Sequence, residues 1–280
     1  MLALLKRNFL LYFRNRSGVF FSLLGALISF VLYIIFLQKN LTDAWAQLPN
    51  SGPVLNNWLM SGTLAVTGIT TSLAALTQLV KDREHQVDQD LYLSDQGKWR
   101  LPFSYLTSAI IISFFMQVLM YVLMCGYFRE VPPLSLLPEV LLIMLFSSLL
   151  SSLVNAIFVY FFHSVDSLGK FATIVGTASG FLVGTYVPLG VLPDFAQLLM
   201  KCTPATYITA LYRQVLMKEA VSETFKGRDD LLREFQEKMG VQLKWQALLT
   251  KEQTYLIVLG GILLALGIWI SLAKRSSKRK

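Results

Sequence analysis

The sequence predicts an all-α integral membrane protein: six transmembrane helices, an amphipathic helix ahead of the first, and a re-entrant helical hairpin before the last. Three observations lead to this fold class. Of 280 residues, 54% are hydrophobic and only 15% are charged, a composition typical of membrane proteins. Uncharged stretches long enough to cross a bilayer recur along the chain. The net charge of +8 is concentrated near the two ends, as membrane orientation requires, so we expect no nucleic-acid partner.

Residues 1–17 are expected to form a cytoplasmic amphipathic helix on the membrane surface. Arg7 and Arg14 fall on one side of this helix, where they would meet anionic lipid headgroups. The simpler alternative is a cytoplasmic extension of the first span. The opposite, apolar side would carry Leu2, Leu5, Phe9, Tyr12 and Phe13.

Residues 18–280 are expected to form a single transmembrane domain. The predicted spans cover residues 19–37, 55–80, 104–128, 140–162, a segment that begins at residue 171, and residues 254–273. Cations cluster before the first span and in the tail KRSSKRK. Both ends should therefore be cytoplasmic, which requires an even number of crossings.

Residues 171–216 are largely apolar but too long for one crossing of a hydrocarbon layer about 30 Å thick. The segment is interrupted by Pro188, Pro193 and Pro204, each of which lacks a backbone donor and disfavours helix at the preceding residue. Irregular backbone facing lipid is costly, as are charged side chains such as Arg213. We therefore predict a re-entrant hairpin over residues 188–216 and an extracellular, helical loop over residues 217–253.

The second and fourth predicted spans carry many polar side chains. On the fourth span these side chains are spaced so that they share one helical face. Such stripes either pack against neighbouring helices or line a translocation path. The path-lining candidates are Asn57, Thr63, Thr67, Thr71, Ser147, Ser151 and Asn155. In the fifth span, Gly176, Gly180 and Gly184 recur every four residues, which predicts a close-packed seam inside the protomer or between two protomers.

The connection over residues 81–100 is highly charged and is predicted to be a solvated docking helix. A site for a metal ion or for acid–base chemistry is the alternative, but the adjacent pair Glu84 and His85 matches no metal-binding spacing on a helix, so no metal is expected. The docking candidates are Arg83, Glu84, His85, Asp88, Asp90 and Leu91.

The whole chain resembles the type-2 permease subunits of ATP-binding cassette exporters. The most specific part is VPLGVLPDFAQLLMKCTPATYITALYRQVL, where the family pattern falls on Pro188, Pro193, Pro204, Tyr207 and Arg213. The charged segment is similar to the coupling helix of the family, although Gln86-Val87 stand where many members have Gly-Thr. The resemblance implies a docking role for this segment and a partnership with a second permease chain, either a copy or a paralogue.

The chain lacks the G-x-x-x-x-G-K-[ST] loop that cradles phosphates: the Gly-Lys pairs at Gly97 and Gly169 have no earlier glycine at the required position. The chain is therefore not expected to be an enzyme or to hold a cofactor. ATP and Mg²⁺ would be bound by two copies of a separate ATPase subunit, which would drive export by alternating access. The resemblance also suggests a multi-pass membrane protein. We expect its membrane to be the cytoplasmic membrane of a bacterium.

Three alternatives remain open from the residues. A non-transporting membrane assembly protein or sensor would use residues 217–253 as its working part. An ion-coupled transporter would need carboxylates or histidines within its spans, and His163 and Asp166 are the nearest, at a span end. For an exporter, hydroxyl-lined apolar spans favour an amphipathic or hydrophobic substrate such as a drug, toxin, lipopeptide or pigment, with a polysaccharide or lipid-linked glycan as the other class.

Overall fold

The computed structural model describes residues 1–44, 51–93, 97–129 and 132–279. These residues form helices, turns and loops. The β-structure among them is limited to one isolated antiparallel bridge between Lys244 and Leu248. The all-helical fold class predicted from the sequence is therefore confirmed.

The first two helices are separate. Helix α1 covers Leu2–Arg14 and α2 covers Arg16–Leu32. The break between them falls at Asn15, whose side-chain oxygen accepts a hydrogen bond of 3.0 Å from the backbone nitrogen of Gly18 and so caps α2. Helix α2 continues through a π-helical turn, η1 (Tyr33–Leu37), into α3 (Gln38–Ala44).

Five helical segments are long and apolar enough to cross a membrane, judged by length and composition among the described residues. The predicted span that begins at residue 171 corresponds to α8 (Val165–Leu182), which is not among these five. The five segments are Arg16–Leu41, Gly52–Glu84, Trp99–Phe128, Leu134–Val159 and Lys251–Arg275.

Those segments belong to the long helices of the bundle. Helix α4 covers Ser51–Glu84, α6 covers Gly97–Phe128, α7 covers Leu137–Val159 after the short η2 (Leu134–Leu136), and α13 covers Lys251–Arg279. Helix α4 is central, since it packs against α2, α6, α7, α8 and the later helix α10. Its buried side chains include Trp58, Leu59 and Met60, which have no exposed surface.

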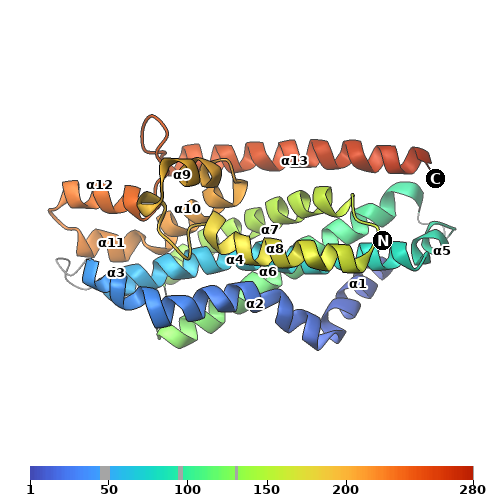
Figure 1. Ribbon diagram of the computed structural model, residues 1–280, viewed down its shortest axis with the longest axis horizontal. Helices are drawn as coiled ribbons and strands as arrows, with labels where there is room; N and C mark the ends of the chain where they lie inside the picture. Colours follow the sequence, from blue (N-terminus) through green and yellow to red (C-terminus); the bar gives the residue numbers. More distant parts are fainter. Residues whose placement is uncertain (45–50, 94–96, 130–131, 280) are drawn as a thin grey trace.

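The long helices α2, α4, α6, α7, α8 and α13 run along the long axis of the molecule (Figure 1). Helix α1, the short helix α5 (Val87–Leu93) and both chain termini lie at one end. The helices between α8 and α13 lie at the other end. The two ends of the molecule therefore consist of different elements, and we call them the termini end and the distal end.

After α8 the chain is broken into short pieces, and each piece begins at or just after a proline. Pro188 precedes η3 (Leu189–Val191), Pro193 precedes α9 (Asp194–Lys201), and Pro204 is the first residue of α10 (Pro204–Leu216). Proline suits a helix start because its missing N–H is not needed there. Helix α10 is buried along most of its length, where it packs against α4, α7 and α13.

The segment predicted as an extracellular loop contains α11 (Lys218–Thr224), α12 (Asp229–Lys238) and a non-helical stretch over residues 239–250. It is attached closely to the bundle. The indole nitrogen of Trp58 donates a hydrogen bond of 2.8 Å to the carbonyl of Met239. A Cβ at Gly190 would stand 2.6 Å from the Cα of Lys238, so only glycine allows η3 and α12 to approach this closely.

Candidate functional site

An ion pair joins α1 to the end of α4 at the termini end of the bundle. Both terminal nitrogens of Arg7 donate to the carboxylate of Asp82, at 2.7 and 2.8 Å. Asp82 also accepts hydrogen bonds from Gln78, at 2.7 Å, and from the hydroxyl of Tyr105 on α6. The hydrogen bond from Arg7 to Asp82, together with the negative charge of that carboxylate, raises the pKa of Arg7.

This pairing changes the role predicted for Arg7. The sequence places Arg7 among the cations that meet anionic lipid, whereas in the structure it is the partner of a carboxylate that is only 3% exposed. Asn8 lies beside it and donates to the hydroxyl of Ser108 at 3.3 Å. Phe9 and Phe13 on α1 remain exposed, as expected for a helix lying against lipid.

Two of the predicted docking residues make internal contacts with the turn between α7 and α8. Arg83 donates to the carbonyls of Tyr160 and Phe162, at 3.2 and 2.8 Å. The carboxylate of Glu84 accepts a hydrogen bond of 3.0 Å from the backbone nitrogen of Val165, the first residue of α8. The last turn of α4 is therefore fixed to the helices on its other side as well as to α1.

The other predicted docking residues are divided between the surface and the interior. His85 and Asp90 are exposed, Leu91 is half-buried, and Asp88 is 8% exposed. The helix turns sharply between α4 and α5 at Gln86, whose φ of 60° lies in the left-handed region. The exposed carboxylate of Asp90 on α5 and the imidazole of His85 in the turn before it are thus presented at the termini end.

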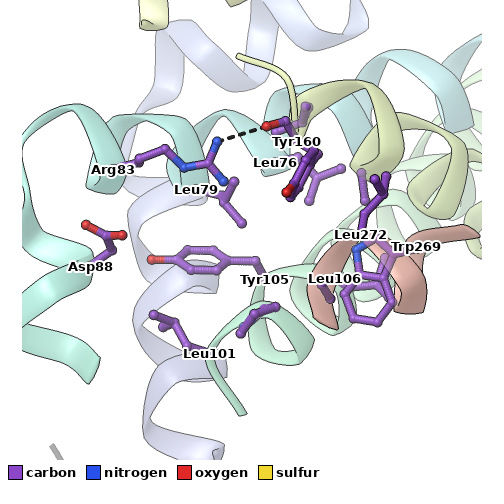
Figure 2. A pocket seen from close by; sticks show the side chains of 14 residues that line it. Leu76, Leu79, Arg83, Asp88, Leu101, Tyr105, Leu106, Tyr160, Trp269 and Leu272 are labelled. Atoms are coloured by element: carbon purple, nitrogen blue, oxygen red, sulfur yellow. Dashed lines mark hydrogen bonds between the residues drawn. The ribbon is translucent and has the colours of Figure 1, made fainter. Parts of the chain in front are cut away.

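A small cavity of about 80 Å³ lies behind α5. Figure 2 shows Arg83 and Asp88 on one side of it, Trp269 and Leu272 of α13 on the other, and the ring of Tyr105 between them. Ligand pockets usually exceed ~300 Å³, so this volume is too small for a substrate. It separates the docking segment from the end of the last helix.

A larger cavity of about 430 Å³ lies between α4, α7, α8 and the start of α10. Three of the predicted path-lining residues, Ser147, Ser151 and Asn155, contribute to its wall. Most of the other lining side chains are apolar, and the volume lies in the usual range for ligand pockets. They include Ala65, Ile69, Leu150, Val154, Phe158, Phe171, Ile174, Val175, Ala178, Leu182, Pro204, Ala205 and Ile208.

The four path candidates of α4 lie elsewhere. Thr63, Thr67 and Thr71 have no exposed surface, and Asn57 is 8% exposed. Two of these hydroxyls bond back to their own helix: Thr67 donates to the carbonyl of Thr63 at 2.8 Å, and Thr71 to that of Thr67 at 2.6 Å. Within this single chain they pack against other helices, and none of them is among the described residues that line the larger cavity.

The three seam glycines occupy three different environments. A Cβ at Gly176 would meet nothing within 4 Å, whereas one at Gly180 would collide with the ring of Tyr186 in the following turn. Gly184 lies beyond the end of α8 with φ +67°, a backbone conformation that suits glycine. The seam between protomers stays a prediction. Gly68, where a Cβ would stand 2.7 Å from the hydroxyl of Ser147, was not predicted from the sequence, because a single glycine forms no repeat.

Arg213 of the predicted hairpin is fully buried and connects distant segments. It donates to the carbonyls of Gly184, at 2.7 Å, and Gly240, at 3.2 Å. Its guanidinium carbon lies 4.7 Å from the centre of the Trp58 ring, in a cation–π contact. Neither Trp58 nor Gly240 was singled out from the sequence, because nothing in the pattern shows that residues this far apart meet.

Tyr207, the other polar hairpin candidate, ties α10 to its surroundings. Its hydroxyl donates to the carbonyl of Lys201 at 2.8 Å and lies 3.1 Å from the indole nitrogen of Trp245, which donates to it. The hairpin residues thus hold α9, α10 and the stretch over residues 239–250 together at the distal end.

These features define a multi-pass membrane protein with an amphipathic helix and a charged connection at one end of its bundle. A sequence profile of the family described as "ABC-2 family transporter protein" matches residues 35–269. The chain belongs to this family, whose members are membrane permease components of ATP-binding cassette transporters. No curated protein matches the sequence.

Proposed function

We propose that the chain is the permease subunit of an exporter that moves an amphipathic or hydrophobic substrate outward by alternating access. Two copies of a separate ATP-binding cassette ATPase would supply the energy, and a second permease chain, identical or paralogous, would complete the path. ATP and Mg²⁺ would be bound by the ATPase. Membership of the ABC-2 family supports the permease and the ATPase partner; the remaining parts rest on the geometry that follows.

The observation that carries the proposal is how firmly the last turn of α4, which leads into α5, is attached to the rest of the bundle. Asp82 ties the last turn of α4 to α1 and α6, while Arg83 and Glu84 tie it to the α7–α8 turn. A force applied to the exposed surface of α5 would therefore reach the ends of most long helices at once. Rigid coupling of this kind is what a partner that drives alternating access requires.

The termini end is proposed to face the cytoplasm. Lys6 and Arg14 lie on α1, Arg16 begins α2, and the tail adds further cations, in agreement with the excess of basic residues on cytoplasmic segments. Because both termini lie at this end (Figure 1), the chain must cross an even number of times. Helix α8, whose 18 residues extend about 27 Å, would supply the sixth crossing.

The larger cavity supports the proposed substrate class. Its wall is mostly apolar, with Ser147, Ser151 and Asn155 as hydrogen-bonding groups, a combination that suits a molecule with both apolar and polar parts. The lining contains no charged side chain among the described residues. A drug, toxin, lipopeptide or pigment fits these properties better than a polysaccharide or lipid-linked glycan, whose many hydroxyls would need more partners.

The docking of the ATPase is tested by reversing one exposed charge on α5. Asp90→Arg should reduce capture of an ATP-binding cassette ATPase by the tagged permease at least fivefold, because it places a cation in the proposed contact surface. Glu223→Arg, the same change on exposed α11 at the distal end, is the matched control and should leave capture unchanged. Equal capture by both variants would contradict the docking role of α5.

The same preparation separates an exporter from a membrane assembly protein or sensor. A strain from which the gene for this protein is deleted should become sensitive to certain compounds. An exporter complex should hydrolyse ATP faster when these compounds are added. A complex whose ATP hydrolysis never responds to such compounds would favour the alternative functions.

A further inference from the structure

We propose that a cavity at the distal end binds an anionic group, namely a phosphate. The cavity measures about 360 Å³ and lies between α10, α11, α12 and the start of α13. It is separate from the larger apolar cavity, since the two share no lining residue. The charge of its wall, the buried Arg213 that contributes to this wall and its position carry the inference.

The wall of this distal cavity is basic. Arg213, Lys218 and Lys251 contribute to it, whereas no acidic side chain is among its described lining residues. Gln236 and Gln242 add amide groups that can donate further hydrogen bonds, and Gln214 adds a third amide, whose nitrogen already donates one hydrogen bond of 3.0 Å to the carbonyl of Val241. Lys251 is partly neutralised, because its amino group donates to Glu139 at 2.9 Å. Two cations and a set of neutral donors therefore remain for a ligand.

Among the described residues, no carboxylate pairs with the guanidinium of Arg213. The residue is 2% exposed, and the groups that bond to it are backbone carbonyls and the ring of Trp58. Its Nε atom is buried and has no hydrogen-bond partner in the described structure. A buried cation without an anionic partner is costly. An anion in the adjoining cavity would supply the missing charge.

The position restricts the source of the anion to two kinds. The cavity is built from the segment over residues 217–253 and the end of α10, so it lies at the distal end of the bundle beside α11 and α12 (Figure 1). A free phosphate could reach it from solvent, and the headgroup of an anionic phospholipid could reach it from the adjacent leaflet. Both present the same phosphate oxygens to the same cations.

The experiment uses the purified full-length chain and two phosphate probes. Inorganic phosphate is titrated against the protein in a zwitterionic detergent, and the protein is separately placed in nanodiscs of phosphatidylcholine with or without phosphatidylglycerol. Binding is followed by the midpoint of thermal unfolding, which a ligand of the folded state raises. A saturable rise with inorganic phosphate identifies a free anion as a ligand. A rise confined to phosphatidylglycerol identifies the headgroup.

Lys218→Gln provides the decisive variant, because Lys218 is exposed and its removal should not disturb folding. It should lower the affinity about tenfold for the phosphate probe that binds, because one charge-assisted contact is lost. Lys226→Gln, an exposed lysine outside the cavity, is the matched control and should bind as the parent does. Lys218→Glu should weaken binding further.

The proposal is overturned if neither phosphate probe raises the unfolding midpoint, or if Lys218→Gln and Lys226→Gln bind equally well. Neither result depends on the ATPase or on transport. Failure of the anion site would therefore leave the proposed permease function untouched.

Discussion

Single side chains at the two ends of the bundle solve the same electrostatic problem in different ways. At the termini end, the buried carboxylate of Asp82 is paired with Arg7 and with two neutral donors. At the distal end, Arg213 relies on the carbonyl dipoles of Gly184 and Gly240 and on the face of Trp58. The first arrangement is complete within the chain, whereas the second leaves a positive charge available.

Asp82→Asn tests the contribution of the buried ion pair. The substitution keeps the size of the side chain but removes the charge that holds Arg7, and a buried polar group that loses its partner costs about 1–3 kcal/mol. We expect a lower midpoint of thermal unfolding for the purified protein.

Asp166→Asn is the matched control for that measurement. The Asp166–Lys170 pair is also short, at 2.6 Å, but its side chains are 74% and 76% exposed, and exposed pairs contribute little. Equal changes in the unfolding midpoint for the two variants would show that burial of Asp82 confers no extra stability.

At the scale of elements, the cavity between α4, α7, α8 and α10 depends on where the chain is broken. Helix α8 ends at Leu182, the chain turns at Gly184, and Pro204, which contributes to the wall of the cavity, starts α10. A continuous helix through this region would run past α7 and leave no concave space. The prolines and the positive-φ glycine thus create a cavity at the side of the bundle.

Filling this cavity should block transport without preventing assembly. Ala178→Phe places a ring among the lining side chains, so a deletion strain that carries it should remain sensitive to the compounds that define the deletion phenotype. Thr177→Phe adds the same ring on the exposed side of α8 and should restore resistance. If Ala178→Phe restored full resistance at normal protein levels, the result would contradict a role of this cavity in transport.

The sequence predicts these elements unevenly. The long helices follow from hydropathy, and the breaks at Pro188, Pro193 and Pro204 follow from backbone chemistry. The contacts at the candidate sites do not. Arg7 and Asp82 are 75 positions apart and Trp58 and Met239 are 181 apart, so their pairing depends on how the helices pack. The repeat of Gly176, Gly180 and Gly184 predicts one helical seam, but α8 ends before Gly184.

At the scale of the whole molecule, the two ends of the bundle should lie on opposite sides of the membrane. In a variant without Cys125 and Cys202, the two cysteines of the chain, a cysteine at exposed Lys238 of α12 should react with an impermeant thiol reagent in whole cells. A cysteine at exposed Lys6 of α1 should react only after lysis. The reverse pattern would invert the proposed orientation, and labelling of both sites in whole cells would contradict it.

Helix α4 has a mechanical consequence. Its 34 residues form one uninterrupted rod about 50 Å long, well beyond the ~30 Å of the hydrocarbon layer. One tip carries Asp82 and leads into α5, and the other carries Trp58, bonded to Met239. Because α4 packs against α2, α6, α7, α8 and α10, we expect a displacement of the end that leads into α5 to be passed along the whole rod. The two ends of the bundle would then move together, with no unwinding in between.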